Sequence, residues 1–158
     1  GQAVPGNFGT TDIGLENNST DALNEQILSD LQQSDLDALH TDGRIPQTTH
    51  INSSESFWSS GDTGLSVGMK HSIIASHGDV RLIPLIDAIS DGSGENVEYH
   101  IVGWGMAELV TSTWKGQNNS EVVIKKMYKY DGMLRPNRDL SVTDGVVIGG
   151  FTAPVLVQ

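Results

Sequence analysis

The residues of this chain that could perform chemistry are few and scattered. Ser66 and Lys70 stand four positions apart in a stretch that predicts a helix, a spacing at which a lysine could serve as the base for a serine nucleophile. Nothing nearby suggests an oxyanion hole, and surface helices often place serine and lysine one turn apart by chance. We therefore expect an ordinary surface role for this pair, and no enzyme activity.

A second motif belongs to the chemistry of aspartic proteases. The segment Gly61–Gly64 contains Asp-Thr-Gly, but those enzymes need two such carboxylates that share one proton. The chain holds no second copy, because Thr143-Asp144-Gly145 has the residues in the wrong order. We expect Asp62 or Thr63 to cap the helix that follows.

Neither the histidines nor the acidic residues follow a standard metal-binding pattern. No two of the five histidines are spaced as His-x-x-x-His, and HExxH is absent. Asp91, Ser93 and Glu95 carry oxygen side chains at alternate positions, as the start of a calcium loop does. The twelfth position counted from Asp91 is Val102, where an EF-hand has glutamate. A hairpin turn without metal is the better prediction, and no cofactor is expected.

The three tryptophans are the candidates for binding a partner. Trp58, Trp104 and Trp114, together with the tyrosines, could form an aromatic surface for a sugar or a protein. Core packing explains large aromatic residues equally well in a chain with only nine of them. Their exposure decides between these two interpretations.

Composition narrows the class of protein. The chain has 158 residues, which is about one domain, so residues 1–158 are expected to fold as a single domain. Its net charge of −11 repels phosphate backbones and anionic membrane surfaces, so nucleic acid is not an expected partner. Cysteine is absent, which removes disulfides and thiolate chemistry. The chain lacks an initiator Met and a signal peptide, and we expect that an anchor or targeting segment was removed.

The positions of turn formers and apolar residues predict the elements that hold these side chains. Two β-rich runs, 80–89 and 97–110, flank a turn at 91–96 and predict a hairpin at the centre of a sheet. Gly103 and Gly105 indicate a bulge or a close backbone approach in the second run. Apolar spacing predicts helices at 20–32 and 64–77 and a short helical turn at 36–40, and further strands are expected at 10–15, 121–130, 145–151 and 154–157.

These elements predict an α+β domain. We expect a mostly antiparallel, twisted sheet or partial barrel of five to six strands, with two to three helices packed on it. The segment 44–60 is polar and is expected to be a loop or an irregular strand.

A series of short motifs lies, in chain order, at 5–9 with 12–14, 26–27, 61–64 with 81–85, 99–104, 122–130 and 149–157. In this order the motifs resemble the C-terminal region of TadG-like proteins, a family associated with Flp pilus assembly in the tight-adherence (Tad) system. The resemblance covers nearly the whole chain.

The resemblance implies part of a larger bacterial envelope protein, anchored in the membrane by a missing N-terminal segment and lying outside the cytoplasmic membrane. It implies other pilus-assembly or envelope proteins as partners, a structural role without catalysis, and no catalytic residues. Two alternatives remain open. One is a carbohydrate- or peptide-binding module that uses exposed aromatic residues, and the other is a hydrolase whose site is assembled from distant residues.

Overall fold

A computed structural model describes residues 9–14, 19–63, 65–91, 97–115, 120–136 and 155–156 of the chain. It confirms the α+β class. The elements, in chain order, are β1 (Gly9–Thr11), α1 (Thr20–Ser29), α2 (Gln33–Thr41), β2 (Ile51–Asn52), β3 (Phe57–Thr63), η1 (Val67–Met69, a 3₁₀ turn), α3 (Lys70–Ala75), β4 (Val80–Ile89), β5 (Val97–Thr113), β6 (Glu121–Tyr130), β7 (Met133–Leu134) and β8 (Val155–Leu156).

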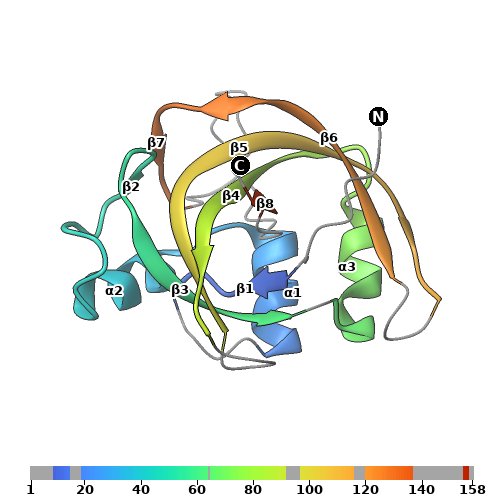
Figure 1. Cartoon of the computed structure of the whole chain (residues 1–158), viewed down its shortest axis with the longest axis horizontal. Helices are drawn as coiled ribbons and strands as arrows, with labels where there is room; N and C mark the ends of the chain where they lie inside the picture. Colours follow the sequence, from blue (N-terminus) through green and yellow to red (C-terminus); the bar gives the residue numbers. More distant parts are fainter. Residues whose placement is uncertain are drawn as a thin grey trace.

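The long strand β5 is the centre of the main sheet (Figure 1). One of its edges pairs antiparallel with β4, which confirms the predicted central hairpin. Two strands lie one after the other along its other edge: β3 pairs with residues 97–101 of β5, and β6 pairs with residues 104–113. β1 extends the sheet beyond β3, and β8 lies parallel to β4. A mostly antiparallel sheet of six strands results.

A second, two-stranded sheet lies where β3 and β6 meet. β2 precedes β3 and β7 follows β6, and the two short strands pair antiparallel. Ser53 and Gly132 fasten this junction, since the Ser53 amide donates to the Gly132 carbonyl at 2.8 Å and the Gly132 amide donates to Ser53 Oγ at 3.0 Å. The segment expected to be a loop or irregular strand therefore contains two short regions of strand.

The register of β4 and β5 shifts at the glycine-containing part of β5, as the sequence predicts. Leu85 pairs with Gly103 and Ile86 with Ile101, so Val102 is left outside the register. An extra residue of this kind reverses the alternation of side chains along a strand. Consequently Tyr99, Ile101 and Trp104 all contribute to one core, although two of these positions are odd and one is even.

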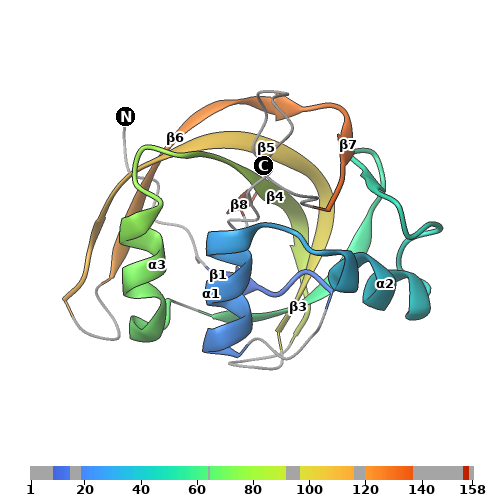
Figure 2. The ribbon, with the colours of Figure 1, turned by 180° about the vertical axis from the view of Figure 1, so that it is seen from behind.

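The buried apolar residues form two clusters. In both ribbon views α1 and α3 lie side by side beneath the arch of β4, β5 and β6, while α2 lies beyond β3 (Figure 1 and Figure 2). The larger cluster joins α2 and the loops to the sheet through Ile13, Leu31, Leu36, Leu39, Ile45, Ile51, Phe57, Leu82, Ile86, Val97, Tyr99, Ile101, Trp104 and Leu134. The smaller one joins α1 and α3 to it through Leu23, Ile27, Met69, Ile73, Ile83, Ala107 and Leu109.

The first predicted helix ends earlier than expected. α1 stops at Ser29 because Asp30 leaves the helical backbone conformation, with φ of 64° and ψ of −174°. This combination of backbone angles is occupied almost only by glycine and does not continue a helix. The Asp30 amide donates to the Gln26 carbonyl and closes the last turn. A new helix, α2, then begins at Gln33 and extends over the helical turn predicted at 36–40.

The second predicted helix, 64–77, is shorter than expected. Ser66 caps the 3₁₀ turn η1, whereas Asp62 and Thr63, which were expected to cap this helix, belong to β3. Regular α-helix covers only Lys70–Ala75. Met69 and Ile73 are fully buried, as the apolar stripe predicts, but Ile74 is exposed. No helix in the described ranges has the length and apolar character that crossing a membrane requires.

Candidate functional site

Several buried polar side chains of the described regions lie around the C-terminal half of α1. Five of them form a region that we call the α1 junction: Asp12, Gln26, Asp30, Asp35 and Arg81. All five are less than 10% exposed. Because buried polar groups are costly unless they are hydrogen-bonded, the partners of each one show what it does.

Gln26 holds the chain that leaves β1. Its amide nitrogen donates to the Ile13 carbonyl and to Asp12 Oδ1, both at 2.8 Å, and its amide oxygen accepts from the Ile13 amide at 3.1 Å. The side chain therefore acts on Ile13 as a neighbouring strand would, satisfying both backbone groups. Gln26 thus fixes α1 against the end of β1.

Arg81 connects the start of β4 to the end of α1. Its guanidinium donates to Asp30 Oδ1 at 2.6 Å and to Asp79 Oδ2 at 2.8 Å. Burial raises the pKa of Asp30 to about 6, although the charge of Arg81 beside it acts in the opposite direction. This buried ion pair links two elements that are 51 positions apart in the sequence.

Asp35 is a buried carboxylate at the start of α2. It accepts a hydrogen bond from the Gln32 amide at 2.7 Å, which caps the helix. Burial raises the pKa of Asp35 to about 6, and the nearby charge of Asp12 acts in the same direction. The capping hydrogen bond therefore stabilises Asp35 in its place, whereas burial and the charge of Asp12 destabilise its ionised form.

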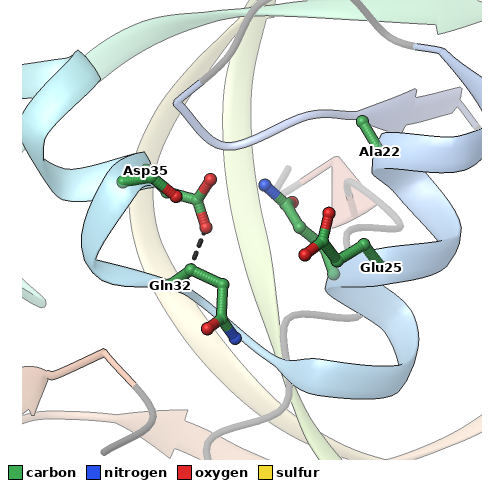
Figure 3. A pocket seen from close by; sticks show the side chains of 6 residues that line it. Ala22, Glu25, Gln32 and Asp35 are labelled. Carbon is green, nitrogen blue, oxygen red and sulfur yellow. Dashed lines mark hydrogen bonds between the residues drawn. The ribbon is translucent and has the colours of Figure 1, made fainter.

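A small pocket lies beside Asp35. Gln32 and Asp35 at the start of α2 lie opposite Ala22 and Glu25 of α1 (Figure 3), and Gln26 and Ser34 complete the lining. Two carboxylates in one pocket is the arrangement that a hydrolase would need. The cavity volume is about 20 Å³, however, which is room for about one water molecule. A substrate does not fit in this pocket as it stands.

The other predicted reactive groups have structural partners or stand apart. Ser66 Oγ accepts from the Gly68 amide at 3.2 Å and lies 3.4 Å from Thr20 Oγ1, so it caps η1 and faces α1. Asp91 is exposed, while Ser93 and Glu95 lie outside the described residues. Within the described part of the chain no group of three histidine or acidic side chains is arranged to hold a metal ion.

The structure separates the three tryptophans. Trp104 is 2% exposed in the larger core, and Trp114 packs partly against the smaller core and donates to Ser112 Oγ at 2.9 Å. Trp58 is 40% exposed on β3. Of these three candidates for partner binding, Trp58 is therefore the one that is exposed in the folded protein.

Trp58 belongs to a group of interacting residues that we call the Trp58 face: Arg44, Trp58, Asp87 and His100. Trp58 lies directly opposite His100 on β5, and their rings stack with centroids 5.0 Å apart and planes 30° apart. His100 Nδ1 lies 2.7 Å from Asp87 Oδ1. Arg44 donates to the Trp58 carbonyl from the loop after α2. Three side chains from separate elements thus surround Trp58: His100 stacks on its indole, Asp87 bonds to His100, and Arg44 binds its backbone carbonyl.

The hydrogen bond to Asp87 determines what His100 offers to a ligand. A carboxylate only accepts hydrogen bonds, so His100 Nδ1 carries the proton in this pair. In the neutral imidazole the other nitrogen, Nε2, is then an acceptor. When His100 is neutral, the Trp58 face combines an apolar ring surface with an acceptor nitrogen, which suits a ligand that carries N–H or O–H groups beside apolar atoms.

Sequence reasoning found Trp58 but missed its companions. The register that puts His100 opposite Trp58 follows from strand pairing across distant segments, which no local pattern reveals. Asp87 reaches His100 because β4 has an irregularity there, with Ile86 paired to Ile101 and Ala88 to His100. The one available signal was alternation, since His100 is polar between the buried residues Tyr99 and Ile101.

Comparison with known protein families, with curated proteins and with solved structures finds no match to this chain.

Proposed function

We propose that this chain is a non-enzymatic assembly module of a pilus-related envelope protein of the Tad/Flp type, lying outside the cytoplasmic membrane. In this proposal the module contacts another pilus-assembly or envelope protein through the Trp58 face. The order of short motifs described above supports the family and the compartment. The exposure of Trp58 and the stacking of its indole on His100 support the binding role and are the observation that carries it.

An exposed tryptophan held in one orientation is what a protein interface favours. Tryptophan is enriched among the residues that contribute most binding energy, and they usually lie at the centre of a patch. Stacking on His100 and the hydrogen bond from Arg44 to its carbonyl reduce the freedom that Trp58 would lose on binding. The carboxylates of the α1 junction, in contrast, are hydrogen-bonded within the fold, which favours a scaffold over an enzyme.

The proposal is tested by photo-crosslinking in the full-length protein, expressed in its native host, with a photoreactive amino acid at position 58. We expect a crosslink to a pilin or a pilus-assembly component, identified by mass spectrometry. Position 74 is the matched control, because Ile74 is 43% exposed but lies on α3. Equal crosslinking from both positions, or none from position 58 in an exported and folded protein, would overturn the proposal.

A carbohydrate- or peptide-binding module is the second candidate, and the acceptor nitrogen beside the indole favours it. The two exposed aromatic residues of the described regions, Trp58 and Tyr128, do not form a continuous row, since they lie on different strands opposite different parts of β5. Titration with neutral oligosaccharides, followed by tryptophan fluorescence in the native chain and in Trp58→Phe, separates the candidates. Saturable quenching that Trp58→Phe abolishes would favour sugar binding.

A further inference from the structure

The strand β6 is the basic part of an acidic chain. The first 110 residues contain 16 acidic residues and three basic ones, whereas six of the nine basic residues lie between positions 115 and 138. Three of those six, at positions 125, 126 and 129, belong to β6. Lys125 and Lys129 are exposed, and neither forms an ion pair with another residue of the described ranges. β6 therefore carries local positive charge that is not neutralised by an ion pair there.

β6 also has an edge that none of the described strands occupies. It pairs with β5 along its ten residues, and among the described strands it has no second neighbour. The outward amides and carbonyls of such a strand can pair with another extended chain. Val123 and Tyr128 are 38% and 55% exposed on the same strand, so apolar contact area accompanies the positive charge.

We infer that β6 binds an extended acidic segment of a partner polypeptide, which adds to the main sheet as a further strand. The backbone of β6 would supply hydrogen bonds, and Lys125 and Lys129 would supply charge complementarity. Lys125 lies opposite Glu108 and Lys129 opposite Gly105 across a register shift in β6. The two lysines consequently face opposite sides of the sheet, and the added strand would carry acidic residues on both of its faces.

The charge pattern argues against a second copy of this chain as the occupant. Two β6 strands paired with each other would bring lysines close to lysines, and like charges across a strand pair are destabilising. Lysines on edge strands also serve another purpose, because they prevent unwanted pairing between sheets. If Lys125 and Lys129 only prevent pairing between sheets, no acidic strand should bind to β6. Binding experiments therefore distinguish this protective role from partner binding.

The experiment uses a ten-residue peptide of Val, Thr and four Glu with blocked ends, and the 158-residue chain labelled with ¹⁵N. We expect saturable binding that weakens at least about tenfold when the four Glu are replaced by Gln, or when two central residues are replaced by Pro. Hydrogen exchange of β6 amides should slow in the complex. Affinity should also fall steeply as salt concentration rises.

A variant pair assigns the binding to β6. Lys125→Glu with Lys129→Glu should lower affinity for the Glu peptide at least about tenfold. Lys70→Glu with Lys115→Glu changes the net charge equally outside β6 and should alter affinity less than about twofold. The thermal midpoint of each variant confirms that it is folded.

Three results would overturn the inference. These are no binding, binding that leaves β6 amide exchange unchanged, and equal losses in the two variants. The Trp58 face plays no part in this experiment, so its outcome is independent of the assembly function proposed above.

Discussion

Two groups of polar side chains in this protein have similar chemistry and different surroundings. In the α1 junction, Asp30 and Asp35 are almost fully buried and bond to a guanidinium and a backbone amide. On the Trp58 face, the Asp87 side chain is 52% exposed and bonds to His100, whose ring stacks on an exposed indole. Water can replace a partner on the Trp58 face, but not readily in the junction.

This difference in burial gives the two regions different roles, one in stability and the other in ligand binding. Removing one partner from a buried pair leaves a desolvated group behind, so the junction should dominate stability. Exposed contacts exchange with water at little cost, so the Trp58 face should contribute little to stability and remain available to a ligand. The predictions below test the contrast by changing one region at a time.

The largest effect is expected from Arg81→Met, which leaves Asp30 buried without its counter-ion. We expect the free energy of unfolding to fall by about 3 to 5 kcal/mol. Urea denaturation followed by circular dichroism measures the change. The double variant Asp30→Asn/Arg81→Met removes both charges and should recover most of the loss. A loss below about 1 kcal/mol in Arg81→Met would show that the junction does not depend on this ion pair.

A smaller effect is expected for Asp35, and it depends on pH. The folded state holds the proton of Asp35 more tightly than the unfolded state, because its pKa is raised from 3.8 to about 6. The stability contributed by this group is therefore present at acidic pH and is lost as the pH rises from about 4 through about 6. A shift of this size corresponds to roughly 3 kcal/mol.

Asp35→Asn removes this titration and keeps an oxygen that can accept from the Gln32 amide. The variant should therefore match the native chain near pH 4 and be more stable at neutral pH by up to roughly 3 kcal/mol. Asp37→Asn is the control, since Asp37 is exposed on the same helix. Denaturation curves at several pH values give the comparison. A parallel pH dependence in the Asp35→Asn and native chains would contradict the assignment.

The parts of the fold that the sequence predicts are those that local patterns of residues determine. The central hairpin and β6 follow from alternating residues between turn formers, and β6 occupies the predicted range 121–130. These are local patterns, and burial of one face reinforces them. The α+β class follows from their order along the chain.

The structural features that the sequence does not predict are determined by contacts between residues that are far apart along the chain. In η1, Gly68 packs so closely on Thr20 that a Cβ at Gly68 would lie 2.5 Å from Thr20 Cγ2. α1 ends at Asp30, whose carboxylate meets Arg81 from a strand 51 positions later. The Trp58 face requires the register of three strands. Such features depend on partners that are distant in sequence, which helix and strand patterns do not encode.

The smallest effect on stability is expected from the Trp58 face. Trp58→Ala should lower the free energy of unfolding by about 1 kcal/mol or less, because the side chain is already 40% exposed. A double-mutant cycle with His100→Ala should give a coupling energy of about 0.5 to 1 kcal/mol for the stacked pair. Urea denaturation of the native chain, both single variants and the double variant measures it. A coupling energy above about 2 kcal/mol would show that the Trp58–His100 pair stabilises the fold, as the α1 junction does, and would remove the contrast between the two regions. A partner that displaced His100 from the indole would then lose that much binding free energy.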